Sequence, residues 1–257
     1  MQRFRSLFLA AASCAMALAL PAAAAEAAEF SPAQRQEIGA IIKDYLIHNP
    51  EALREAIDAL SEHDKQIEAQ ARQTVVADQS GPLFSSKFQE NIGNPKGEAT
   101  LVEFFDYNCH FCKGALPDVT RLLKDDPNLK LVLKDFPVLG PGSVEAANVA
   151  SAVRNQLQGD RFWQFHTRLL STHGPVGKAE ALAVAKELGV DMDRLAKDMQ
   201  APNANSGILE VAHLADALQI TGTPSFVVGQ DVVVGAVGYD QLKEKLDSVH
   251  KCGHATC

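Results

Sequence analysis

Hydrophobic residues follow two different periods along the chain, and the change of period separates its two main parts. Between residues 32 and 79, apolar residues recur every three or four positions and Gly39 is the only glycine, which is typical of amphipathic helices. From residue 100 onward, short apolar and β-branched runs alternate with helical patterns. This alternation predicts an α/β fold preceded by a helical segment.

The helical segment is predicted to contain two helices. Ser31-Pro32 is a favourable helix start, and Asn49-Pro50 ends the first helix and begins a second. The second helix carries residues at alternating steps of four and three, which is heptad spacing weakened by Asp64. Packing on its own domain is one interpretation of this stripe; we favour self-association, because the following domain looks complete without it. The stripe consists of Leu53, Ile57, Leu60, Asp64, Ile67, Ala71 and Thr74.

The second part is predicted to follow the order strand, helix, strand, helical block, hairpin, helix. Residues 91–97 look like a turn-rich lead into the first strand, and His166 and His173 in the helical block are predicted to be surface or capping residues. This order indicates a helical insertion in an α/β fold. The predicted strands are 100–106, 130–136, 226–228 and 232–234, the helical block is 143–217 and the last helix is about 240–249.

The first 28 residues have the pattern of a secretory signal peptide. Arg3 and Arg5 precede an apolar run at 7–20, and an alanine-rich region with cleavage options follows at 23–28. The apolar run is too short for a membrane span. Cys14 lies inside this segment, and its removal with the signal is favoured over lipidation. We therefore expect an exported protein.

Composition and charge narrow the class of protein. The chain of 257 residues is 46% hydrophobic and 22% charged, as ordinary globular proteins are. Its formal net charge of −8 argues against nucleic acid as the main partner. Four cysteines remain after Cys14, too few for a disulfide scaffold. An even number in an exported protein nevertheless favours local disulfides.

Cys109 and Cys112 stand at the start of a predicted helix, directly after a predicted strand. Unpaired N–H groups and the helix dipole at that position, together with a protonated His110, would lower the pKa of Cys109 and stabilise its thiolate. Cys112 lies one turn inside the helix and suits the resolving role. A zinc ribbon would need a second pair of ligands. The pair therefore favours redox chemistry.

The stretch GNPKGEATLVEFFDYNCHFCK, with Thr-Pro before a hairpin far downstream, resembles the thioredoxin fold in its DsbA-like branch. It looks most like the suppressor-of-copper-sensitivity protein C (ScsC) group of periplasmic thiol oxidoreductases. The resemblance covers about 90–250 strongly and the helical segment in outline. It implies a periplasmic location and an N-terminal region that forms trimers for disulfide isomerisation.

The resemblance also implies roles for three residues, Glu103, Lys134 and Pro224. Glu103 matches a buried acid that exchanges a proton with the second cysteine, and Lys134 matches the lysine that pairs with it. Pro224 matches a cis-proline facing the cysteines, while Thr223 and Phe111 are candidates for substrate binding. Outward-facing strand charges and an ordinary trans turn proline remain the alternatives.

The tail carries a second group of candidate ligands, Cys252, His254 and Cys257. A small terminal disulfide is favoured. Two thiolates and an imidazole could instead hold Cu(I) or Zn, and a second redox pair or an intermolecular link is also open.

These observations predict a signal peptide (1–28), a helical oligomerisation segment (29–80), a thioredoxin-like catalytic domain (81–250) with its insertion at about 143–217, and a Cys/His tail (251–257). The expected activity is disulfide isomerisation of misfolded exported proteins that contain cysteines. No cofactor is needed besides the redox-active cysteine pair.

The expected partners are a membrane-bound thiol reductase and two further copies of the chain. The heptads alone would suit a dimer, whereas the resemblance implies a homotrimer. Because the dipeptide between the cysteines is His-Phe, redox strength stays open. A dithiol oxidase and a copper-sequestering protein are the alternatives.

Overall fold

A computed structural model describes residues 30–257, so the predicted signal peptide lies outside the described residues. The described residues divide into two units, the first ending at Ala59 and the second comprising Leu60–Cys257. None of the helices described in 30–257 is long and apolar enough to cross a membrane.

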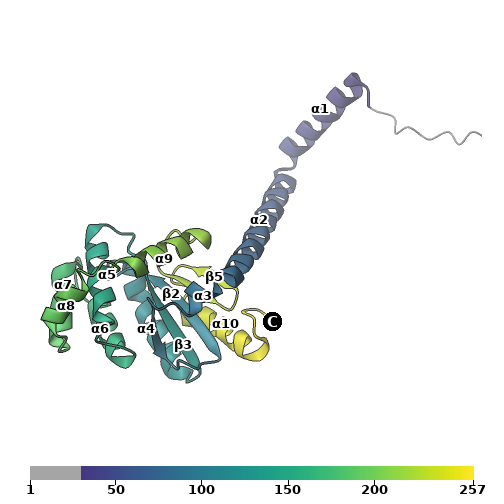
Figure 1. Cartoon of the computed structure of the whole chain (residues 1–257). Helices are drawn as coiled ribbons and strands as arrows, with labels where there is room; N and C mark the ends of the chain where they lie inside the picture. The colour runs from purple at the N-terminus through teal and green to yellow at the C-terminus, as the bar shows by residue number, and fades with distance from the viewer. Residues whose placement is uncertain (1–29) are drawn as a thin grey trace, which may run out of the picture. The chain divides into compact units, whose positions relative to one another are not determined.

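The helical segment forms the two helices that the sequence predicts (Figure 1): α1 (Pro32–His48) and α2 (Pro50–Asp78), the second of which ends within the second unit. Ser31 caps α1 in a capping box, in which its hydroxyl accepts a hydrogen bond from the Gln34 N–H at 3.3 Å. Helix α1 buries no residue and α2 buries only Val76. The apolar faces of both helices are therefore exposed in the single chain.

The second unit is built on a sheet of five strands in the order β1-β3-β2-β4-β5. Strands β2 and β3 run parallel, joined by helix α4, whereas the other neighbouring pairs are antiparallel. The bounds are β1 Glu90–Gly93, β2 Ala99–Phe105, α4 His110–Asp125, β3 Leu129–Asp135, β4 Ser225–Val228 and β5 Asp231–Val234.

Helices cover both faces of this sheet. Leu101 and Phe105 of β2 pack with residues of α4, α10 and the helical insertion, whereas Val102 and Phe104 on the opposite face pack with α3, α9 and the end of α2. The α/β fold with a helical insertion is therefore confirmed. The remaining helices are α3 Ser80–Phe84, α5 Pro141–Val153, α6 Asp160–Leu170, α7 Lys178–Glu187, α8 Met192–Asp198, α9 Ser206–Ala217 and α10 Tyr239–Cys252.

Two short elements were not predicted. Residues 90–93 form the edge strand β1 instead of a turn, because they pair antiparallel with β3 and bury Ile92. Helix α3 follows α2 directly and buries Leu83 in the same core cluster as Val76. The end of α2 is consequently part of the core of the second unit.

Candidate active site

The first turn of α4 presents the two cysteines. Cys109 is the N-cap of this helix, and its Sγ accepts a hydrogen bond from the Cys112 N–H at 3.3 Å. The helix N-terminus offers unpaired N–H groups and the positive end of the dipole to this sulfur. Both cysteines are free thiols. The chain thus holds a reduced dithiol at the end of β2.

The two thiols differ in burial. Cys109 keeps 4% of its surface exposed and Cys112 keeps none. Both thiols are therefore buried, and Cys112 is the deeper of the two. The residues between the cysteines point outward instead: Phe111 is 65% exposed, and its ring packs edge-on against that of His110.

The loop before β4 faces the active-site thiol. The Cys109 thiol donates a hydrogen bond to the Thr223 carbonyl at 3.1 Å, and the Thr223–Pro224 peptide bond is cis, as the resemblance implied. These contacts bring residues that are more than a hundred positions apart to one site.

The surroundings separate the pKa values of the two thiols. Hydrogen bonds lower the pKa of Cys109 to about 6, first from the Cys112 side chain and then from the Thr223 side chain and the N–H groups of Phe111 and Cys112, although burial opposes them. The same hydrogen bond to Cys109, with burial, raises the pKa of Cys112 far above its ordinary value. Cys109 therefore supplies the nucleophilic thiolate at neutral pH. Stabilisation by a protonated His110 stays a prediction.

Alkylation tests this assignment. The reactivity of Cys109 with iodoacetamide should rise with pH and reach half its maximum near pH 6, because the thiolate reacts. Cys112 should stay unlabelled. In Cys112→Ser, the midpoint should stay near or below that of the wild type, since a hydroxyl is a stronger hydrogen-bond donor than a thiol. Labelling of Cys112 ahead of Cys109 would show that the roles are reversed.

Glu103 lies beneath the cysteines in β2. Its side chain is 2% exposed, and its neighbours on the adjacent strands are Leu133 and Phe226. Burial, and to a smaller extent the charge of Cys109, raises the pKa of Glu103 to about 8. A buried carboxyl group with this pKa can accept and return a proton near neutral pH.

Lys134 does not pair with Glu103, so this prediction was wrong. The parallel register sets Lys134 beside Phe104, whereas Glu103 lies beside Leu133. Because side chains alternate between the two faces of a strand, Lys134 and Glu103 point to opposite faces. Lys134 Nζ instead donates hydrogen bonds to the Pro82 carbonyl at 2.6 Å and to Gln89 at 2.8 Å, and lies 3.9 Å from Glu210.

Comparison with known proteins agrees with this geometry. The family model of the DSBA-like thioredoxin domain matches residues 100–247, more than half of the chain. The chain belongs to the DSBA-like thioredoxin family. A second model, the copper resistance protein ScsC N-terminal domain, matches residues 34–73.

Solved structures similar to this DSBA-like protein include a thioredoxin-like oxidoreductase from Silicibacter pomeroyi DSS-3, with 39% identity and a TM-score of 0.63 over 67% of this chain and 98% of that one. A mutant of Proteus mirabilis ScsC has 25% identity and a TM-score of 0.65 over 88% of this chain and 99% of that one. The chain is thus similar to thiol–disulfide oxidoreductases of the DsbA and ScsC type.

Curated relatives extend the comparison. The chain is 32% identical over 143 residues to the Na(+)/H(+) antiporter NhaA 1 of Salinispora arenicola, covering 54% of this chain and spanning only 22% of that protein. It is 24% identical to the probable disulfide bond formation protein D of Bacillus anthracis, over 66% of this chain and 82% of that protein. The first similarity thus concerns one part of a longer protein.

Asp106 organises the loop of the DSBA-like site and was missed in the sequence. Its carboxylate accepts hydrogen bonds from the Val138 and Leu139 N–H groups at 2.9 and 3.0 Å, and from the Ser143 hydroxyl at 2.7 Å. It also accepts from the N–H of Asn108 at 2.8 Å, one residue before Cys109. Asp106 therefore ties the start of the insertion to the cysteine loop. Only the position directly after a strand could have signalled this role.

His166 is fully buried, which corrects the prediction of a surface or capping residue. Its ring stacks on Trp163 at 5.2 Å and meets Phe105 edge-on at 4.6 Å, and neither ring nitrogen has a hydrogen-bond partner. Burial lowers the pKa of His166 to about 3, so the ring is neutral. Helical spacing placed this residue on the core side of α6.

Replacing the ring by phenylalanine should stabilise the fold. His166→Phe keeps the aromatic contacts and removes two unpaired buried nitrogens, so we expect unfolding free energy to rise by about 1–3 kcal/mol at pH 7. The gain should grow as pH falls from 6.5 toward 3, because only unfolded wild type binds the proton there. Urea unfolding measures this, with the exposed His173→Phe as the neutral control. A loss of stability would contradict it.

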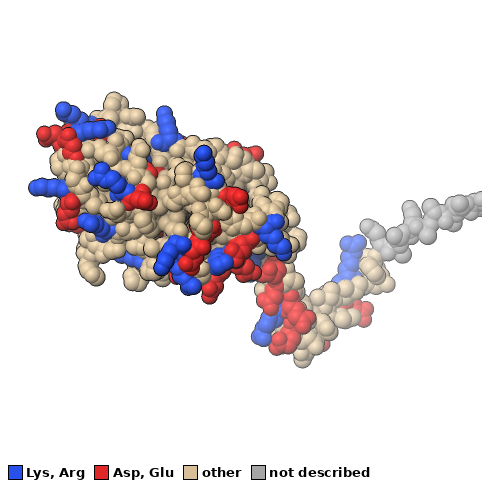
Figure 2. Space-filling view, turned by 90° about the horizontal axis from the view of Figure 1, so that it is seen from below, with Lys and Arg blue, Asp and Glu red and all other residues tan. Residues whose placement is uncertain are grey.

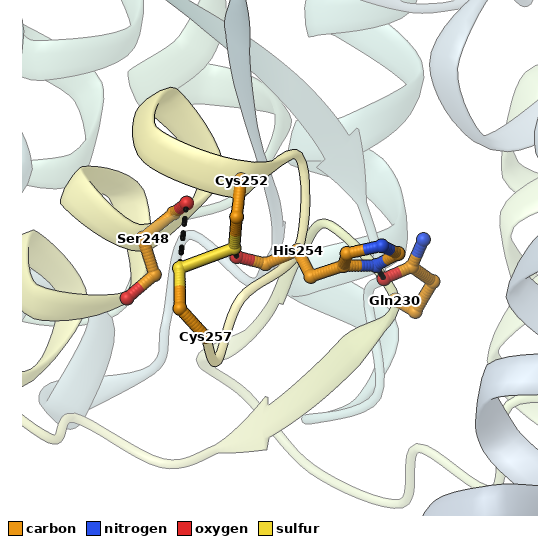
Figure 3. The surroundings of a disulfide bond; sticks show 5 residues. All are labelled: Gln230, Ser248, Cys252, His254 and Cys257. Carbon is orange, nitrogen blue, oxygen red and sulfur yellow. Dashed lines mark hydrogen bonds between the residues drawn. A yellow bond between two sulfur atoms is a disulfide. The ribbon is translucent and has the colours of Figure 1, made fainter.

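The tail forms a disulfide between Cys252 and Cys257, so the favoured prediction is confirmed. The His254 ring forms a hydrogen bond with Gln230 Oε1 at 3.0 Å (Figure 3). Within residues 30–257, no group of three or more His, Cys, Asp or Glu residues could hold a metal ion. In this state the tail is therefore not arranged as the copper or zinc site.

Proposed function

We propose that this oxidoreductase is a periplasmic disulfide isomerase. The Cys109 thiolate attacks a wrong disulfide and forms a mixed disulfide with one substrate cysteine, releasing the other as a thiolate. A second substrate thiol then displaces Cys109, or Cys112 does so in a reductive escape. Since this cycle starts from the reduced dithiol, a membrane-bound thiol reductase is the expected electron donor.

The surface around the dithiol suits unfolded chains. Phe111, Val138 and Leu139 are 65%, 44% and 55% exposed, and the Asp106 hydrogen bonds hold the last two near the cysteine loop. Such apolar residues favour contact with the apolar segments of misfolded exported proteins. On the face seen in Figure 2, acidic and basic side chains are interspersed, which supports a partner other than nucleic acid.

The observation that carries the isomerase proposal is the unpartnered apolar stripe of the helical segment. Leu53, Ile57 and Leu60 are 44%, 57% and 61% exposed, although their spacing is that of core-facing residues. We propose that this stripe packs in a homotrimer. Several linked active sites raise the effective concentration of thiols around one substrate, which favours rearrangement over a single oxidation.

Breaking the stripe with one charge tests the proposal. Ile57→Asp should convert a species of three chain masses in light scattering into a monomer. The monomer should still reduce insulin, because the dithiol is untouched, but refold a scrambled multi-disulfide protein poorly. Ala59→Asp is the matched control, since it adds the same charge off the stripe. A monomeric wild type would refute the proposed self-association. A dimeric wild type would refute the trimer that the family resemblance implies.

Two other functions give different outcomes in the same assays. A dithiol oxidase would form disulfides in a reduced substrate but leave scrambled ones unchanged. A copper-sequestering protein would retain the metal under anaerobic reduction and lose thiol reactivity while loaded. Either result would replace the isomerase proposal.

A further inference from the structure

The tail disulfide lies away from the active-site dithiol. Pro224 precedes β4 and Gly229 follows it, so the two sites are at opposite ends of this strand of four residues, about 13 Å long. Ala255 of the tail packs at the Gly229 end, and His254 bonds with the neighbouring Gln230. The disulfide therefore plays no part in the chemistry of Cys109 on its own chain.

Both cysteines of the tail are accessible. Cys252 is the last residue of α10, Cys257 returns along the same helix, and both are exposed (Figure 3). Cys257 also borders a hollow of about 360 Å³ on the α10 surface. Exposed disulfides exchange more readily with thiols than buried ones. The other residues of this hollow are Asp240, Lys243, Glu244, Asp247, Ser248 and Lys251.

The tail already contains the acceptors that two free thiols would need. The Ser248 carbonyl lies 3.4 Å from Cys257 Sγ, and the His254 carbonyl lies 3.7 Å from Cys252 Sγ (Figure 3). A disulfide sulfur has no proton to donate, whereas a thiol has one. Each thiol would therefore find a hydrogen-bond acceptor in the tail after reduction.

The tail also keeps its place without the disulfide. Ala255 is 4% exposed and belongs to the main core cluster, and the His254–Gln230 hydrogen bond involves neither cysteine. The cysteines are only five positions apart, and a short loop constrains the unfolded chain least. The bond is thus poorly suited to be a major structural crosslink, and the thiols stay close enough to re-form it.

We propose that Cys252 and Cys257 form a second thiol–disulfide exchange site, which takes electrons from dithiols, including the Cys109–Cys112 pair of another copy. The donor thiolate attacks one tail sulfur; the Cys252–Cys257 bond breaks and a mixed disulfide forms. The donor's second thiol then displaces the tail cysteine. Two electrons and two protons pass to the tail, and the donor leaves as a disulfide.

Two full-length variants isolate this transfer. The acceptor carries Cys109→Ser and Cys112→Ser with its tail oxidised; the donor carries Cys252→Ser and Cys257→Ser with its active site reduced. After equimolar mixing without oxygen, alkylation and peptide mass spectrometry should find more than a tenth of the tail pairs reduced. Less than one in a hundred, or the same amount with a donor that also carries Cys109→Ser, would overturn the proposal.

A second measurement separates exchange from unfolding. Dithiothreitol should reduce the tail of the folded acceptor within about tenfold of its rate in denaturing urea, because an exposed disulfide needs no opening. The donor variant should keep the circular dichroism and thermal midpoint of wild type, since Ala255 holds the tail. Reduction that requires urea, or a donor that fails to fold, would show a structural disulfide and overturn the proposal.

Discussion

Cys109→Ser should abolish thiol–disulfide exchange, whereas Cys112→Ser should accumulate mixed disulfides with substrate. A serine hydroxyl cannot replace the thiolate as the nucleophile. Cys112 acts one step later, by displacing Cys109 from the substrate, so its loss leaves the attack intact. Insulin reduction and non-reducing gels with a disulfide-containing substrate measure the two effects.

The size of each effect follows from the pKa of Cys109. With a pKa of about 6, most of this thiol is ionised at pH 7, against about 3% for an unperturbed cysteine. Nucleophilicity falls as pKa falls, which cancels much of this advantage in the attack itself. The larger gain is in release, because a stable thiolate leaves faster. The mixed disulfides that Cys112→Ser forms with substrate should therefore be cleaved quickly when a thiol such as glutathione is added.

Controls make the assignment specific. Adding glutathione to Cys112→Ser should restore turnover partially, since it takes over the resolving step, while Cys109→Ser should stay inactive. If the Cys109→Ser variant formed a mixed disulfide between Cys112 and substrate, the second cysteine would be able to attack. The roles argued from burial would then be wrong.

Local patterns predicted most of the fold. The period of α1 and α2, the runs that form β2 and β3, and the helical insertion were all visible in the sequence, because each element's burial repeats at its own spacing. Strand β1 was not, since Ile92 is its one buried apolar residue and the strand depends on its hydrogen bonds with β3. Asn91 and Gly93, on either side of Ile92, are residue types that favour turns when only the local sequence is considered.

The sequence predicted the parts of the active site that depend on neighbouring residues in the chain. It did not predict the parts that depend on the register between strands. The cysteine pair and its helix start are local features. Lys134 was assigned to the wrong face, because only the pairing with Phe104 decides which way it points. The burial of His166 was missed for a different reason: it shares the core side of α6 with apolar residues, but a polar ring was expected at the surface.

Glu103→Gln should make the protein more stable in alkali and slower in the step that uses Cys112. Glu103 is fully buried with its pKa raised to about 8 from 4.5. The native state therefore holds a proton that the unfolded state has lost, and stability falls as pH rises from 4.5 to 8. Each unit corresponds to about 1.4 kcal/mol, so Gln, which never ionises, should gain several kcal/mol by pH 8.

The catalytic cost comes from the same carboxyl group. When Cys112 attacks a mixed disulfide its proton must leave, and the Glu103 carboxylate, whose charge raises the pKa of Cys112, is the acceptor that lies beneath it. Losing a general base slows such a step by about 10²–10⁴-fold. Stopped-flow release of substrate from the mixed disulfide should therefore slow, while alkylation of Cys109 keeps nearly its wild-type rate.

Glu98→Gln supplies the matched control, because Glu98 stands just before the same strand with a side chain that is 74% exposed. It should change neither the slope of stability with pH nor the rate of release. For Glu103→Gln, urea unfolding at pH 4.5 and at pH 8 is decisive. A stability gain of the same size at both values would mean that the carboxyl group does not titrate between them, and the proton would have to leave Cys112 by another route.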